Sequence, residues 1–277
     1  MRLEFPKKPE KLTPAEHKLL EYIEGNREEF LFMTIGQLAV KMEVSEATIS
    51  RFVRHLGCQD YKQLKNIVIE QNHLEGPAGK MAGTLFRDEN AQTFQTADFL
   101  KRQMLYLEKT IQNLDLQTWE QAITKIMNAR KIWIHAKSAS FAMGQLLFFR
   151  LRRLGLSVQM IPSGGTEMME GLAQAGEGDL VLFFAFSKVS WEGRVILDNA
   201  KTAGYQTLCF TGRLCIPEEE QADMNIYVYR GEVGEYHSMT SATALIDALV
   251  VALSEQLGAK GAQNLQKIHK MKKKYRI

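Results

Sequence analysis

Apolar residues recur at helical spacing through the first seventy or so positions of the chain, and no stretch alternates as a strand would. Thr13 and Pro14 predict the capped start of a helix, and Leu19 and Ile23 follow them in the sequence on its apolar face. Three shorter helices are predicted next, at residues 34–42, 45–56 and 60–74. Gly57 follows the second of these, where a left-handed cap is expected. The first part of the chain is therefore predicted to be all-α.

The pattern changes after residues 75–88, where periodicity lapses and the glycine- and proline-rich residues 76–83 predict a linker. Two amphipathic helices, 91–113 and 118–129, precede a series of short apolar runs. The predicted strands are 131–136, 157–161, 180–185, 206–210 and 225–229. The predicted helices among and after them are 141–154, 166–175, 191–203 and 240–257. Because helices fill most of the gaps, parallel strands in βαβ order are expected.

Composition places the chain among ordinary globular proteins, with 277 residues, 45% hydrophobic and 24% charged. The longest strongly apolar run, residues 180–186, is too short to cross a bilayer, so we expect a soluble, cytoplasmic protein with no membrane partner. Cys58, Cys209 and Cys215 are odd in number and form no CxxC pair, and the six histidines show no close pairing. No disulfide, metal site or cofactor is therefore expected.

Charge is unevenly distributed in this chain of net charge +3. Residues 260–277 contain seven basic side chains and no acidic ones. Such a block can contact phosphates or an anionic surface, but a solvated, partly frayed terminus is the commoner outcome. The tail alone supports no functional assignment.

Residues 35–57 have the spacing of a helix-turn-helix, in which two short helices pack across a tight turn. The small and apolar positions that carry this spacing are Leu38, Ala39, Met42, Val44, Ile49 and Phe52. Ser45 is expected to cap the second helix, whose outward face is short, polar and arginine-bearing, as a major groove requires. The residues predicted to contact DNA are Ser45, Ala47, Thr48, Ser50, Arg51 and Arg54, with Lys62 and Lys65 on the phosphate backbone.

An ordinary helical bundle is the alternative for this region. Residues 1–72 hold eleven basic and eleven acidic side chains, so the region is not globally basic. Glu43 also occupies the turn position where glycine is often found. The match at six small and apolar positions nevertheless favours DNA binding.

Four segments, 12–16, 35–39, 44–57 and 61–65, resemble the N-terminal domain of RpiR-type bacterial transcription regulators. The resemblance implies an all-α helix-turn-helix domain at 1–74, a linker at 75–90, and an α/β SIS domain that binds phosphosugars at 91–277. The implied SIS fold is flavodoxin-like, with a five-stranded parallel sheet and helices on both faces. The strand ending at Thr211 and the helix from Ser241 to Asp247 also resemble SIS segments.

Two hydroxyl-rich turns follow the first and third predicted strands, where an open α/β sheet binds its ligands. The candidate ligand-binding residues are Ser138, Ser140, Ser187, Lys188 and Ser190, with Lys137 as a further source of charge. Serines in such turns serve equally well as helix caps. Their resemblance to the SIS phosphate turns favours a sugar phosphate, although Ala136, Ser138 and Lys188 replace three usual glycines and narrow the ligand's approach.

These features predict a DNA-binding transcription regulator whose second domain senses a sugar phosphate and alters operator affinity. A homodimer or homotetramer is expected, since paired half-sites need two recognition helices. An isomerase is a second interpretation, with Glu192, Glu235 or His237 as the base. A third is that the α/β domain only dimerises the protein.

Overall fold

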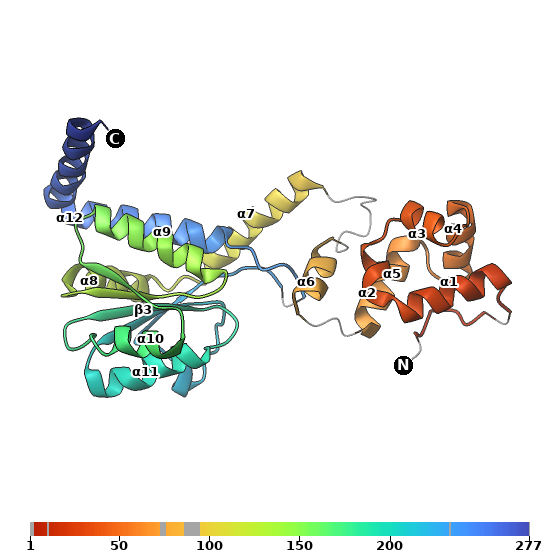
Figure 1. Ribbon diagram of the computed structural model, residues 1–277, viewed down its shortest axis with the longest axis horizontal. Coiled ribbons are helices and arrows are strands. Elements are labelled where there is room, and N and C mark those ends of the chain that lie inside the picture. The colour runs from red at the N-terminus through yellow and green to blue at the C-terminus, as the bar shows by residue number, and fades with distance from the viewer. Residues whose placement is uncertain (1–2, 10, 73–75, 86–94, 233, 277) are drawn as a thin grey trace. The chain divides into compact units, whose positions relative to one another are not determined.

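The computed structural model describes residues 3–9, 11–72, 76–85, 95–232 and 234–276 (Figure 1). The chain forms two compact units. The first comprises Met1–Leu100 together with Gly231–His237, and the second comprises Lys101–Arg230 together with Ser238–Ile277. Each unit is described by itself below.

Among its described residues the first unit contains helices and no strands, as the sequence pattern predicts. They are α1 (Pro14–Gly25), α2 (Arg27–Phe32), α3 (Ile35–Lys41), α4 (Glu46–His55), α5 (Tyr61–Asn72) and α6 (Gly76–Leu85). Thr13 caps α1 in a capping box with Glu16, and Gly57 takes φ +83° beyond α4, both as predicted. Helix α2 is not predicted from the sequence, because its six residues are too few to show a helical period, although Phe30 and Leu31 are fully buried.

The structure differs from the predicted linker in having a helix, α6, over most of it. Gly76 adopts φ +84° and Pro77 follows at once, so the pair that signals a break marks a helix start. Residue 75 and residues 86–90 of the predicted linker lie outside the described residues, as do 91–94 of the predicted helix 91–113.

The second unit is built on a five-stranded parallel sheet with strand order β2-β1-β3-β4-β5, which confirms the predicted flavodoxin-like architecture. The strands are β1 (Ile132–His135), β2 (Val158–Ile161), β3 (Leu180–Ala185), β4 (Gln206–Thr211) and β5 (Met224–Tyr227). The helices are α7 (Thr96–Gln112), whose residues up to Leu100 belong to the first unit, α8 (Leu116–Asn128), α9 (Ser140–Arg153), α10 (Gly165–Leu172), α11 (Trp191–Ala203) and α12 (Thr240–Tyr275), with a 3₁₀ turn at Glu218–Glu220. Parallel strands place the carboxyl ends of β1, β2 and β3 at one edge of the sheet.

Helices cover both faces of this sheet (Figure 1). One face packs against α8, α9 and α12, where Ile134, Leu182 and Leu208 are fully buried. The other packs against α10 and α11, where Trp133 and Phe183 contribute the largest buried side chains. Because side chains alternate along a strand, His135 shares the α10–α11 face with Trp133.

The closing helix α12 is longer than predicted. It continues to Tyr275 beyond an interruption at Gly258, which has φ +50°, so the basic tail is helical where a frayed terminus was expected. Within the described residues, α12 alone is long and apolar enough by length and composition to cross a membrane. Its residues Ile246, Leu249 and Leu253 are fully buried against the sheet, whereas most of its apolar stretch is not buried.

Candidate functional site

The turn between α3 and α4 has the geometry of a helix-turn-helix. The Val44 N–H donates to the Ala39 carbonyl at 3.0 Å, and Ala39 is buried where a larger side chain would separate the helices. Glu43 takes φ +54°, the left-handed conformation that glycine adopts at least cost. The turn therefore keeps its shape without the usual glycine.

Helix α4 presents a polar, arginine-bearing face to solvent. Ser45 caps the helix by accepting a hydrogen bond from the Thr48 N–H at 3.1 Å. Ile49, Phe52 and Val53 face the core. The outward face consists of exposed Ser45, Ala47, Ser50, Arg51 and Arg54, with half-buried Thr48. Arg51 donates from Nε to the carbonyl of Ala47 at 3.3 Å, so its guanidinium lies along this face.

A partly buried contact joins the end of α4 to α1. His55 Nδ1 lies 2.9 Å from Glu16 Oε1, and the second carboxylate oxygen of Glu16 accepts the Thr13 N–H at 2.8 Å. Burial opposes ionisation of Glu16, but hydrogen bonds from Thr13 and His55 outweigh it and lower its pKa. One carboxylate thus caps α1 and orients the helix that carries Arg51 and Arg54.

The two lysines predicted to contact phosphates differ in exposure. Lys62 is half-buried, whereas Lys65 is 4% exposed and places its ammonium 5.2 Å from the centre of the Tyr61 ring. Burial lowers the pKa of Lys65 to about 8. The surface contact expected for Lys65 is therefore not available in the described structure. The Asp60 carboxylate already caps the start of α5, since its Oδ1 accepts the Gln63 N–H at 2.8 Å.

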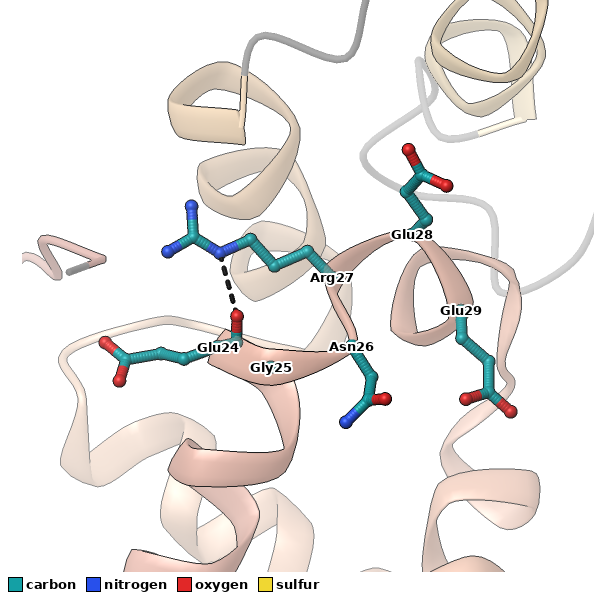
Figure 2. A pocket seen from close by; sticks show the side chains of 6 residues that line it. All are labelled: Glu24, Gly25, Asn26, Arg27, Glu28 and Glu29. Atoms are coloured by element: carbon teal, nitrogen blue, oxygen red, sulfur yellow. Dashed lines mark hydrogen bonds between the residues drawn. The ribbon is translucent and has the colours of Figure 1, made fainter. Parts of the chain in front are cut away.

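A shallow hollow between α1 and α2 is unsuited to DNA. Figure 2 shows Arg27 among three carboxylates, those of Glu24, Glu28 and Glu29. The Arg27 Nε donates to the backbone oxygen of Glu24 at 3.2 Å. Glu29 pairs with Lys41, but the remaining acidic charge repels a phosphate backbone.

In the second unit, the turn after β1 leads directly into α9. Ser138 adopts φ +51°, so this turn also keeps a glycine-type conformation with another residue. Ala136 is buried, and a Cβ at Gly144 of α9 would lie 2.7 Å from its methyl group. The missing glycine in the turn is thus accommodated by a glycine on the helix packed against it. Neither Ser138 nor Ser140 caps α9, whose N-cap is Ala139.

The polar residues of the turn after β3 differ in role: one caps α11, and two are exposed to solvent. Ser190 caps α11, accepting the Gly193 N–H at 3.3 Å, so the capping alternative is confirmed for this serine. Ser187 and Lys188 are exposed at the carboxyl edge of the sheet. Both remain positioned to meet a ligand.

An ion pair joins the two turns. Lys137 Nζ donates to Glu192 Oε2 at 2.7 Å, and Ser190 Oγ donates to the same oxygen at 2.7 Å. A Cβ at Gly164, in the turn after β2, would lie 3.6 Å from Glu192 Oε1. Glu192 therefore lies where the turns after β1, β2 and β3 converge. The sequence identified Lys137 and Glu192 separately, with no signal that they pair.

Glu192 should make folding stability depend on pH. Partial burial opposes its ionisation, but the hydrogen bonds from Lys137 and Ser190 lower its pKa to about 2 from the ordinary 4.5. Since the folded-state pKa is the lower one, the stabilisation is complete above about pH 4.5 and is lost as pH falls toward 2. Glu192 should contribute on the order of 1–3 kcal/mol to the free energy of folding. Solvent reduces this contribution, because the Lys137 side chain is 42% exposed.

Urea unfolding of the wild type and Glu192→Gln tests this dependence. The wild type should be more stable near neutral pH, and the difference between the two proteins should shrink as pH falls below about 4.5. A difference that stays constant across that range would contradict the assignment.

His135 ends β1, and no pattern in the sequence singles it out. It is 3% exposed and lies two residues before Lys137. The Pro162 carbonyl lies beside the imidazole, but neither ring nitrogen has a partner in good hydrogen-bond geometry. Burial lowers its pKa and favours the neutral ring. Among the described residues, no group of three His, Cys, Asp or Glu side chains is arranged to hold a metal.

Two residues considered as bases for an isomerase belong to the first unit. Glu235 and His237 lie in Gly231–His237, the segment between β5 and α12 that clusters with α6. The Glu235 carboxylate accepts the Glu232 N–H at 3.2 Å, and His237 Nδ1 lies 3.3 Å from Lys80 Nζ of α6. Glu192 alone of the three lies among the sheet turns.

Comparison with known proteins agrees with this division of the chain. Residues 3–73 match the family described as "Helix-turn-helix domain, rpiR family", and residues 125–252 match the SIS domain. The protein is thus a helix-turn-helix protein with a C-terminal SIS domain. It belongs to the RpiR-type transcription regulators, as the resemblance in its sequence predicts.

Individual relatives align with all or part of the chain. An HTH-type transcriptional regulator of Caldanaerobacter subterraneus is 23% identical over 250 residues, covering 88% of this chain and 86% of the relative. The Vibrio vulnificus NanR protein, solved in complex with ManNAc-6P, aligns with a TM-score of 0.58 and 20% identity over 95% of this chain and 94% of its own. The sugar isomerase domain of an RpiR transcription factor from Sphaerobacter thermophilus aligns with a TM-score of 0.59 and 18% identity, over 63% of this chain and 97% of its own. At these identities, the structural similarities show the fold.

Proposed function

We propose that this regulator binds operator DNA through α4 in the bacterial cytoplasm and that a sugar phosphate, bound at the carboxyl edge of its sheet, changes its operator affinity. The observation that carries the proposal is the capped α4, with Arg51 and Arg54 exposed, in an RpiR-family domain joined to an SIS domain.

The outward face of α4 supplies the DNA contacts. Arg51 and Arg54 contact guanine edges or phosphates, while Ser50 and Thr48 contact neighbouring bases or the backbone. Ser45 and Ala47 lie at the end of α4 that enters the groove, where a recognition helix makes its base contacts. Lys62 adds a backbone contact. Lys65 is left out of this set because it is buried.

Paired half-sites require self-association, and the second unit offers apolar surface for it. Phe141 and Phe149 of α9 and Val251 of α12 are 46%, 51% and 69% exposed, and α9 packs beside α12. These helices support a homodimer or homotetramer. Sedimentation analysis that found monomers alone at micromolar concentration would contradict it.

The effector site is proposed at the turns after β1 and β3. Ser138, Ser140 and Ser187 offer hydroxyls, Lys188 offers a positive charge, and Ser190 holds the start of α11 in place. A relative with this fold was solved with a sugar phosphate, ManNAc-6P, which supports the ligand class for this chain. Phosphate recognition by hydroxyls, backbone amides and a helix N-terminus is the common chemistry.

A thermal-shift screen of sugar phosphates tests the effector assignment. At least one compound should raise the melting temperature, since a ligand at ~100 times its Kd adds about 2.7 kcal/mol to folding. The matching unphosphorylated sugar should have little effect. Ser187→Ala should weaken binding by ~1.5–3 kcal/mol, the contribution of a charge-assisted hydrogen bond.

The same screen separates this proposal from its alternatives. The stabilising compound should be recovered unchanged after prolonged incubation, because sensing needs binding without turnover. Steady conversion between aldose and ketose would establish an isomerase instead. If no sugar phosphate shifts the melting curve while operator binding persists, the better interpretation is that the α/β domain only dimerises the protein.

A further inference from the structure

The Lys137–Glu192 pair lies between the two turns proposed to bind the effector. Glu192 receives the Lys137 ammonium and the Ser190 hydroxyl, each at 2.7 Å, and lies in the first turn of the thirteen-residue helix α11. An ammonium, a hydroxyl and a helix start are the donors that hold a phosphate in proteins. Here the Glu192 carboxylate accepts hydrogen bonds from the ammonium and the hydroxyl.

A second observation places a binding site at this point. His135 is 3% exposed, ends β1 two residues before Lys137, and shares the α10–α11 face of the sheet. Neither of its ring nitrogens has a partner in good hydrogen-bond geometry, although buried polar atoms are normally paired. A ligand with hydroxyl groups would satisfy this imidazole. The anion position and a buried polar side chain without a partner therefore lie together.

We propose that Glu192 is an internal anion that competes with the effector: the phosphate binds by replacing the Glu192 carboxylate on Lys137 and Ser190. This inference rests on the proposed function and adds how its site is regulated. Without an effector, the carboxylate satisfies Lys137 and bridges the turns after β1 and β3. On binding, Glu192 loses both partners, so the position of the first turn of α11 responds directly to the ligand.

The test compares the wild type with Glu192→Gln, using inorganic phosphate as the probe in calorimetry and thermal shift. Glutamine has the same shape but no charge, so phosphate should bind the variant about tenfold or more tightly than the wild type. Adding Lys137→Met to Glu192→Gln should remove the gain. Glu177→Gln is the matched control, because it removes one exposed negative charge before β3, at the opposite edge of the sheet.

The outcomes separate this inference from the proposed function. Equal or weaker phosphate binding by Glu192→Gln overturns the internal anion, and Glu192→Ala repeats the comparison if the glutamine variant does not fold. If phosphate gains affinity for Glu192→Gln but no sugar phosphate binds either protein, the internal anion stands and sugar-phosphate sensing falls. If one sugar phosphate binds the wild type and Glu192→Gln equally, sensing stands and the internal anion falls.

Discussion

Replacement of Arg51 by alanine should weaken operator binding by ~1–3 kcal/mol, or about 5- to 150-fold in Kd, while the fold and oligomeric mass stay unchanged. Arg51 is exposed on α4, and its Nε donates to the Ala47 carbonyl on the same outward face, so its removal leaves the core residues Ile49 and Phe52 intact. A gel shift with the duplex upstream of the protein's own gene measures the loss.

Arg51→Lys distinguishes the two kinds of contact that Arg51 can make. Lysine keeps the charge but not the planar pair of donors, so a base contact is lost and a phosphate contact is largely kept. Arg27→Ala is the control, because it removes the same group from a hollow lined by carboxylates (Figure 2). Unchanged affinity in Arg51→Ala would remove α4 as the recognition helix.

Much of the DNA-binding surface follows from the sequence because it depends on local rules. Ser45 as a cap, Ala39 as a close contact and the apolar stripe of α4 are all set by spacing within one helix pair. The burial of Lys65 cannot be predicted from local spacing, because it depends on how α5 packs against the other helices. Lys62 and Lys65 look alike in sequence and differ only in the tertiary structure.

The proposed effector site was predictable as a region of the sheet and not as a set of side-chain contacts. Alternation of strands and helices predicts that the turns after β1 and β3 meet at one edge of the sheet. The pairing of Lys137 with Glu192, 55 positions apart, depends on side-chain geometry that no short motif encodes. His135 gave no signal either, because a histidine ending a buried strand is indistinguishable from a core residue until its partners are known.

Transmission of the effector's signal needs a structural link, and one segment offers it. Gly231–His237 lies in the chain between β5 and α12 but packs on α6 of the first unit. The Tyr236 N–H donates to Thr84 Oγ1 at 2.6 Å. At Gly83, an added Cβ would lie 2.2 Å from the backbone oxygen of Gly234, so the two backbones are in direct contact. We propose that this contact couples the effector domain to the helices that bind DNA.

Gly83→Ala should therefore abolish the effector's influence on operator affinity while leaving both binding activities in place. The added methyl group cannot fit against the Gly234 carbonyl, so the segment must separate from α6. Helix α6 itself should gain ~1 kcal/mol from replacing glycine by alanine. The effector should change the operator Kd of the wild type by about 5- to 150-fold, a typical coupling of 1–3 kcal/mol, and that of Gly83→Ala by about twofold or less.

Operator titrations with and without a saturating sugar phosphate measure this coupling, and thermal shift confirms that the variant still binds the ligand. Gly25→Ala is the matched control, since a Cβ at the end of α1 meets no atom within 4 Å. Thr84→Val removes the acceptor of the Tyr236 N–H without adding bulk and should reduce the coupling less than Gly83→Ala does. If Gly83→Ala responds to the effector as the wild type does, the signal does not pass through this contact.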